Sequence, residues 1–406
     1  MKILIVSQYY YPEQFQINEI APALVREGHQ VTVLTGLPNY PKGEIYEGYK
    51  DGYKSLEVVD GVEVIRVKEH PRKKGALHLL WNYWSFASKG KRKAKRLKEK
   101  YDIVFAYQLS PVTSVYPAIQ YSKKHKTPLL LYCLDIWPES AQAQLHTNKS
   151  LLYKTVARLS RNIYQKCTHI AVTSRPFIDY LSRENGIPQE KMSYIPQHAS
   201  SEFLSLNLAA EDNGVTDFMY AGNLGKGQRI DVIIRAAEIL KDRTDFRIHI
   251  VGDGSQRTDL EALVKACGVQ DKVVFYGNQS RADMPEYYKK ADALLITLRG
   301  NNAVGDTMPG KLQTYMTTGK PIFGAINGAA RETIEEAQCG KCVPAEDSIG
   351  LAEIMKEYLE RPENFVDCGE NAKNYFKEHF TKELFMISLQ KKMFELVGED
   401  GVSEVV

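Results

Sequence analysis

DFMYAGNLGKGQRIDVIIRAAEILK, at residues 217–241, joins a short apolar run, a glycine-rich turn and a segment with helical periodicity. The apolar run predicts a buried strand, because such runs between turn signals are typical of parallel sheets. Gly222, Gly225 and Gly227 would let backbone N–H groups approach a phosphate at the positive end of the following helix dipole. In a second interpretation the glycines only permit positive φ in a tight strand-to-helix turn.

The same alternation of apolar runs and amphipathic segments extends in both directions from this stretch. Strands are predicted at 2–8, 31–36, 62–67, 102–107, 128–135, 169–174, 217–225, 246–254, 272–278, 291–298 and 320–325. A polar stretch near residues 198–214 separates the two halves. We therefore expect an α/β protein with two doubly wound parallel-sheet domains, residues 1–200 and 215–380, facing each other across a ligand-binding cleft. A last helix, within 381–400, is expected either to cap the second domain or to cross back to the first.

The composition excludes several classes of protein. The chain has 406 residues, of which 43% are hydrophobic and 25% charged, as in a globular protein of two domains. Disordered, collagen-like and disulfide-stapled chains are excluded, and no apolar run approaches the roughly 18–20 residues that span a bilayer. The apolar part of MKILIVSQYYYPEQ is too short for a secretory signal. Cys339 and Cys342 form a lone CxxC without a second pair, so we expect reduced thiols.

A second segment suited to an anion is GDTMPGKLQTYMTTGKPIF, residues 305–323. Asp306 precedes a Pro-Gly turn, and Lys311 falls in the first turn of a helix that Gly319 ends. A cation in the first helical turn opposes the helix dipole, so its presence favours an anion bound at that place. The alternative is a solvated lysine on a helix surface. Two such helix starts in one domain favour a diphosphate site.

With SQYYYPEQ (7–14), GLPNYPKG (36–43) and LDIWPES (134–140), these motifs resemble the retaining, nucleotide-sugar-dependent glycosyltransferases of family 4. The resemblance covers essentially the whole chain and is greatest to bacterial enzymes of capsule, O-antigen and colanic acid assembly. It implies the GT-B fold, with two facing Rossmann-like domains. It also implies transfer of a sugar from a nucleotide donor, expected to be UDP-linked, to a polyprenyl-diphosphate-linked or saccharide acceptor. No metal or other cofactor is expected, because positive charge and helix dipoles can neutralise the leaving diphosphate.

The resemblance implies that the second domain holds the donor. Catalytic roles are expected for Asp135, Asp306 and Lys311. The residues expected to bind the donor are Gly222, Asn223, Lys226, Arg229, Gly252, Asn278, Gln279, Met308, Pro309, Gly310 and Thr314. The sequence departs from the family pattern at Asn223 and Gln228, where an Arg and a Lys are usual, and at Thr314, where a Glu is usual. Lys226 or Arg229, together with Lys311, is expected to supply the diphosphate charge instead.

In the first domain, Asp135 follows a predicted strand at the mouth of the expected cleft. A carboxylate there could bind a sugar hydroxyl or stabilise oxocarbenium charge, or else cap the following turn. Trp137 is expected to pack on a sugar face, with burial in the core as the alternative. The remaining expected acceptor contacts lie on two loops: Tyr11, Glu13, Asn39 and Tyr40.

A basic segment follows at residues 72–100. Residues 1–200 hold 29 Lys and Arg against 17 Asp and Glu, and residues 70–100 hold eleven of these cations with one acid, Glu99. Apolar side chains precede the basic run: Leu77, Leu79, Leu80, Trp81, Trp84 and Phe86. This combination favours an anionic membrane surface, with a solvated helix face as the alternative. Nucleic acid is not expected, because no recognised binding motif is present. We therefore expect a cytoplasmic protein held at the inner face of the cell membrane.

Two other functions fit the same scaffold. A nucleotide-sugar epimerase would need an acid–base pair that exchanges a sugar proton, and it would form product from the donor alone. A non-catalytic, membrane-associated nucleotide-binding protein would not turn over the donor at all.

Overall fold

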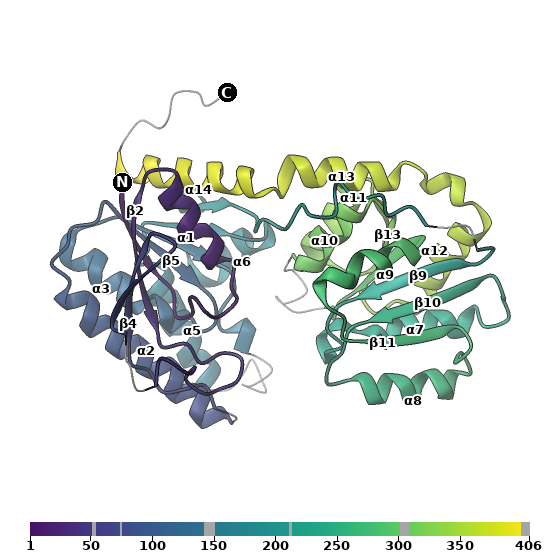
Figure 1. The fold of residues 1–406 in the computed structure, drawn as a ribbon, viewed down its shortest axis with the longest axis horizontal. Helices are drawn as coiled ribbons and strands as arrows, with labels where there is room; N and C mark the ends of the chain where they lie inside the picture. The colour runs from purple at the N-terminus through teal and green to yellow at the C-terminus, as the bar shows by residue number, and fades with distance from the viewer. Residues whose placement is uncertain (51–53, 74, 142–150, 211–212, 301–307, 399–406) are drawn as a thin grey trace. The chain divides into compact units, whose positions relative to one another are not determined.

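The computed structural model describes residues 1–50, 54–73, 75–141, 151–210, 213–300 and 308–398. It divides into two compact units. The first unit contains Met1–Ile195 and the chain from Met386 onward, and the second contains Pro196–Phe385. Each unit is built on one sheet covered by helices (Figure 1).

The first sheet has, within the described residues, the strand order β3-β4-β2-β1-β5-β6-β7-β8. Every neighbouring pair is parallel except β3 with β4. The strands are β1 Lys2–Val6, β2 Gln30–Gly36, β3 Leu56–Val59, β4 Val62–Val67, β5 Ile103–Gln108, β6 Leu129–Cys133, β7 His169–Val172 and β8 Met192–Tyr194. The central strands are largely apolar because helices bury both faces of the sheet.

The helices of the first unit follow the expected alternation with the strands. They are α1 Ile17–Arg26, α2 Ala76–Arg96, α3 Tyr116–His125, α5 Leu151–Tyr164 and α6 Pro176–Asn185. The helices α2 and α3 pack side by side, and α2 also contacts β2 and β4 (Figure 1). Asn82 of α2 donates to Glu69, two residues beyond the end of β4, which places this part of α2 at the carboxyl end of that strand.

The second sheet is parallel throughout its described strands, in the order β11-β10-β9-β12-β13-β14. These strands are β9 Thr216–Ala221, β10 Phe246–Val251, β11 Val273–Gly277, β12 Ala293–Thr297, β13 Ile322–Ala325 and β14 Gly340–Val343. The strand order reverses between β9 and β12, as in a doubly wound sheet. The predicted α/β fold with two such sheets is confirmed, although β3, β8 and β14 were not predicted.

The helices of the second unit connect its parallel strands. They are α7 Ile230–Ile239, α8 Arg257–Cys267, α9 Met284–Lys290, α10 Gly310–Thr318, α11 Gly328–Glu336, α12 Ser348–Glu360 and α13 Cys368–His379. The last helix, α14 Lys382–Val397, packs with the first unit from Met386 onward. There, Gln390 Oε1 lies 2.9 Å from His29 Nε2.

No helix in the described parts of the chain is long and apolar enough to cross a membrane. All six cysteines are free thiols, as expected for a CxxC without a partner pair.

Candidate active site

A pocket of about 400 Å³ opens beyond the carboxyl ends of β9, β10 and β11. It is lined by Ala221, Gly222, Asn223, Val251, Gly252, Asp253, Asn278, Gln279, Met284, Tyr288, Lys311 and Thr314. Seven of these residues were predicted from the sequence: Gly222, Asn223, Gly252, Asn278, Gln279, Lys311 and Thr314. Doubly wound sheets bind their ligands at this edge, next to the reversal of strand order. We call this site the Lys311 pocket.

Two glycines allow neighbouring turns of the Lys311 pocket to pack backbone against backbone. Gly222 and Gly252 have φ angles of +152° and +131°, which residues with a Cβ rarely adopt. A Cβ on Gly252 would lie only 1.9 Å from the carbonyl oxygen of Gly222. The Gly252 N–H in turn donates to the carbonyl of Gly277 at 2.8 Å. The three turns therefore form a continuous backbone surface that a phosphate can approach closely.

Lys311 brings a half-buried cation to this surface from the first turn of α10. Its Nζ donates to Tyr220 Oη and to Gln228 Oε1, each at 2.5 Å, and lies 4.2 Å from the centre of the Tyr220 ring. Burial lowers the pKa of Lys311 to about 7. Within the described residues, no carboxylate forms an ion pair with this ammonium group. An anion entering the pocket would therefore meet a cation whose charge is not already compensated.

Two buried tyrosines position these parts, and neither was predicted as a site residue. The Tyr315 hydroxyl accepts a hydrogen bond from the Ala221 N–H at 2.7 Å and donates to the Ala221 carbonyl at 3.0 Å. This pair of bonds ties α10 to the end of β9. The Tyr220 hydroxyl donates to the carbonyl of Asn223 at 2.9 Å and so braces the turn below Lys311. These bonds to Ala221 join residues 94 positions apart, so no local sequence pattern could have indicated them.

The other residues expected at the donor lie around the Lys311 pocket rather than in its lining. Lys226 is exposed in a short 3-10 turn, Lys226–Gln228. The Arg229 guanidinium binds both carboxylate oxygens of Asp231 at 2.9 Å and also pairs with Glu346. The start of α10 holds three more of them: Met308, half-buried against the core, the N-cap Pro309, and the exposed Gly310. Asp306 lies outside the described residues.

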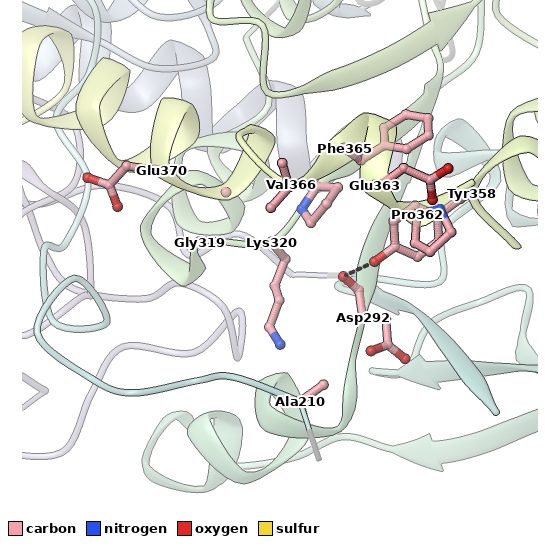
Figure 2. Close-up of a pocket in the computed structure, with 12 residues that line it drawn as sticks. Ala210, Asp292, Gly319, Lys320, Tyr358, Pro362, Glu363, Phe365, Val366 and Glu370 are labelled. Carbon is pink, nitrogen blue, oxygen red and sulfur yellow. Dashed lines mark hydrogen bonds between the residues drawn. The ribbon is translucent and has the colours of Figure 1, made fainter. Parts of the chain in front are cut away.

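A larger pocket, of about 500 Å³, lies at the opposite, amino edge of the second sheet. Figure 2 shows Lys320 there, just before β13, with its side chain extending toward Ala210. Burial lowers the pKa of Lys320 to about 8. The carboxylates of Asp292, Glu363 and Glu370 also line this pocket. This acidic lining and the position at the amino ends of the strands disfavour a nucleoside diphosphate.

In the first unit, Asp135 is held by the turn that follows the neighbouring strand. Its Oδ2 accepts hydrogen bonds from the Ser110 N–H at 2.9 Å and from Ser110 Oγ at 2.6 Å. Asp135 therefore braces two turns at the carboxyl edge of the sheet, and its bonds are not those of an N-cap. Trp137 Nε1 donates to the same Ser110 Oγ at 3.0 Å, and the half-buried indole meets the Tyr83 ring edge-on at 6.4 Å.

The predicted acceptor loops separate into exposed and buried members. Tyr11 and Tyr40 are 46% and 36% exposed, whereas Glu13 and Asn39 are buried. Glu13 Oε1 accepts the backbone N–H groups of Asn39 and Tyr40 at 2.8 and 2.7 Å. Burial raises the pKa of Glu13 to about 7. The side chain of Asn39 lies inside the protein, where its Nδ2 donates a hydrogen bond to Glu69 at 2.5 Å. Glu13 and Asn39 thus hold the loops that present the two tyrosines.

The basic segment at residues 72–100 contains α2, whose exposed face carries apolar side chains first and basic side chains after them. Four large apolar side chains, at helical spacing along one face, are 58–73% exposed: Leu77, Leu80, Trp81 and Trp84. Basic side chains continue the helix toward its carboxyl end, from Lys89 to Arg96. Phe86, which also precedes the basic run, is fully buried, because its position on the helix turns it toward the core, so it does not belong to this exposed face.

The described residues contain no group of three or more His, Cys, Asp or Glu side chains placed to hold a metal ion. The expectation that the reaction needs no metal stays a prediction.

Comparisons with known proteins agree with this architecture. A family model described as "Glycosyltransferase Family 4" matches residues 15–198, and one described as "Glycosyl transferases group 1" matches residues 209–375. A putative colanic acid biosynthesis glycosyl transferase of Escherichia coli K12 is 25% identical, over 79% of this chain and 82% of the relative. An O-antigen chain mannosyltransferase of Escherichia coli is 21% identical, over 94% of this chain and 95% of the relative. The structure of Anabaena HepE in complex with UDP aligns with a TM-score of 0.71 and 16% identity, over 97% of this chain and 100% of that one.

Proposed function

We propose that the chain, a glycosyltransferase of the GT-B fold, transfers a sugar from a UDP-sugar donor to a lipid-linked or saccharide acceptor. The product would be an intermediate of a bacterial surface polysaccharide. The observation that carries this proposal is the Lys311 pocket, where backbone turns, a helix start and an uncompensated cation meet. Relatives named for colanic acid and O-antigen assembly support this class of product.

The Lys311 pocket offers each part of such a donor a different surface. The diphosphate would lie against the turns at Gly222 and Gly252, where Lys311 and the dipole of α10 neutralise its charge. The base would lie beside Asn278 and Gln279, and Thr314 would face the ribose. Anabaena HepE has been solved with UDP and with UDP-glucose, which supports uridine as the nucleoside here.

We propose that the transfer retains the configuration at the anomeric carbon. The acceptor hydroxyl would attack that carbon on the face from which the diphosphate departs, and its proton would pass to the departing phosphate oxygen. Lys311 would stabilise the negative charge that develops on the diphosphate. Asp135, held by Ser110, would stabilise positive charge on the sugar or bind one of its hydroxyls.

We further propose that α2 brings the enzyme to its lipid-linked acceptor. The exposed Trp81 and Trp84 would enter the headgroup region of an anionic membrane, with the basic run beyond them in contact with lipid phosphates. The protein would then act at the inner, cytoplasmic face of the membrane.

The experiment that tests the donor site compares two lysines of the second unit. We expect Lys311→Ala to lower kcat/KM for the UDP-sugar by about 30- to 1,000-fold, because it removes charge from a largely buried site. The matched control, Lys265→Ala, removes an exposed lysine of α8 and should stay within about threefold of the wild type. An effect of Lys311→Ala below about threefold would place the donor elsewhere.

The substrates for this comparison come from a first screen of the wild type. Thermal stability is measured with UDP, GDP, TDP and ADP sugars, because a true donor stabilises the folded chain in proportion to its affinity. Turnover is then measured with a polyprenyl lipid extract. Product formed from the donor without any acceptor would instead indicate the epimerase, and binding without turnover would indicate a non-catalytic protein.

A further inference from the structure

Arg72 lies in an aromatic frame between the end of β4 and the start of α2. Its guanidinium carbon is 5.3 Å from the centre of the Tyr40 ring and 5.9 Å from that of Tyr83. Its Nη1 donates to the hydroxyl of Tyr9 at 3.2 Å, and its backbone N–H donates to Asn39 Oδ1 at 2.8 Å. The half-buried side chain is therefore positioned from both its backbone and its tip.

This guanidinium carries a charge that no carboxylate of the described residues compensates. In the portions of the chain that the structure describes, no carboxylate forms an ion pair with Arg72. Arg66 of the same unit, by contrast, is buried against Glu57 at 2.6 Å. The two buried carboxylates nearby are already occupied: Glu13 accepts backbone N–H groups, and Glu69 accepts Asn39, Asn82 and Gln8.

The aromatic rings stabilise the cation through their faces and, among the described residues, leave most of its N–H donors unused. A guanidinium has five N–H donors arranged as a planar fork, and the Tyr9 hydroxyl accepts only one of them. Ring faces attract the cation without accepting these in-plane donors. The fork matches the oxygen spacing of a phosphate, which it can bind with two parallel hydrogen bonds.

A chain of contacts connects Arg72 to Asp135. The Tyr83 ring that flanks Arg72 meets Trp137 edge-on, and Trp137 donates to Ser110, which holds Asp135. All of these groups belong to the carboxyl edge of the first sheet or to α2. The same helix carries the exposed apolar side chains, beginning with Leu77 in its first turn.

We infer that Arg72, framed by Tyr40 and Tyr83, is a binding site for a phosphate group of a lipid-diphosphate-linked acceptor. The acceptor sugar then extends toward Asp135, and its lipid chain follows the exposed apolar face of α2. This inference deepens the proposed function and rests on it. The site is distinct from the Lys311 pocket, which takes the diphosphate of the donor.

The test measures binding of farnesyl diphosphate, a short lipid diphosphate, to the full-length protein by isothermal titration calorimetry. Saturating UDP is present throughout, so that the Lys311 pocket cannot take the probe. We expect Arg72→Met to weaken binding by about tenfold or more, because a charge-assisted hydrogen bond is lost. Lys73→Met, which removes the exposed neighbouring cation, should change binding by less than about twofold. Arg72→Lys, which keeps the charge without the fork, should fall between them.

Two controls separate the alternatives. Farnesol, which has no phosphate, should bind the wild type and Arg72→Met equally weakly. Sedimentation with anionic vesicles should be unchanged in Arg72→Met. If this variant lost vesicle binding to the same extent as it lost farnesyl diphosphate binding, Arg72 would belong to a general headgroup site and the inference would be overturned. Unchanged farnesyl diphosphate binding in a variant with a wild-type melting temperature would also overturn it. Failure of the wild type to bind UDP would instead contradict the proposed function itself.

Discussion

The ammonium group of Lys311 lies 2.5 Å from the side-chain oxygen of Gln228, although the two residues are 83 positions apart in the chain. In the family that the sequence resembles, a lysine is usual at position 228, and it would bring a second cation to this spot. The neutral amide leaves Lys311 as the one basic side chain among the described residues that line the pocket. In the proposed function, the one basic side chain of the described pocket lining that would neutralise the diphosphate is therefore a half-buried lysine, whose charge is pH-sensitive because its pKa lies near 7.

We expect UDP-glucose binding to weaken as the pH rises above 7. Burial holds the pKa of Lys311 near 7 in the empty site, and an anion favours the charged lysine, so binding takes up a proton above that pH. Between pH 6 and 8.5, affinity should fall by up to about tenfold per pH unit once Lys311 is mostly neutral. Titration calorimetry in two buffers of different ionisation enthalpy measures the proton uptake. Lys311→Met should abolish both effects, and an unchanged pH dependence in that variant would assign them to another group.

Adding a methyl group to Gly252 should prevent the backbone turns of the Lys311 pocket from packing against each other. Gly252→Ala forces a Cβ to within 1.9 Å of the Gly222 carbonyl and strains a positive φ, so we expect destabilisation of at least about 2 kcal/mol and loss of UDP binding. Gly227→Ala is the matched control, because no atom lies within 4 Å of its added Cβ and its φ is not positive. Denaturant unfolding and titration with UDP measure both effects. If the two variants had the same stability and the same affinity for UDP, the close packing of Gly252 against Gly222 would be refuted.

Asp135→Ala should lower turnover without weakening UDP binding. Asp135 lies in the first unit, whereas every residue that lines the Lys311 pocket belongs to the second. We expect kcat to fall about 100-fold or more if the carboxylate stabilises charge on the sugar. Ser110→Ala removes the Oγ bond to Asp135 but keeps the backbone N–H bond, so it should have a smaller effect. If Asp135→Ala turned over the donor as fast as the wild type, Asp135 would have only a structural role.

Sedimentation with anionic vesicles should depend on both parts of α2. Replacing Lys91, Arg92, Lys93, Lys95 and Arg96 by Ser should abolish sedimentation at low salt, because each basic residue near an anionic surface contributes about 1 kcal/mol. The double variant Trp81→Ser, Trp84→Ser should weaken it as well. A matched control replaces two similarly exposed apolar residues of the second unit, Ile349 and Val366, and should sediment normally. Equal binding to neutral vesicles would show that the basic residues only face solvent.

Much of the fold follows from local pattern, and the exceptions have physical causes. The buried parallel strands are continuous apolar runs, which helices on both faces of a sheet require. β8, Met192–Tyr194, is too short to show a pattern, and β14, Gly340–Val343, lies inside a glycine- and cysteine-containing loop sequence. β3, Leu56–Val59, pairs antiparallel at an edge and leaves alternate side chains exposed, which makes it unlike its neighbours.

The residues of the site divide in the same way. Gly222 and Gly252 are visible in the sequence because the turns need glycine, and Lys311 is visible because it opposes its helix dipole. The role of Gln228 is not, because it depends on a contact with α10 from far along the chain. Arg229 forms ion pairs with Asp231, two residues later, and with Glu346, which is distant in the sequence. Its basic charge suggested a phosphate ligand, but local sequence cannot show that this charge is already compensated.

Hydrogen–deuterium exchange of the full chain, with and without UDP, tests the central claim most directly. If the Lys311 pocket holds the donor, UDP should slow exchange in the turns at 221–224, 251–254 and 277–280 and at the start of α10. The amino-edge pocket around Lys320, Tyr358 and Glu370 should exchange as before (Figure 2). Protection confined to that amino edge, with none at the glycine turns or α10, would contradict the account.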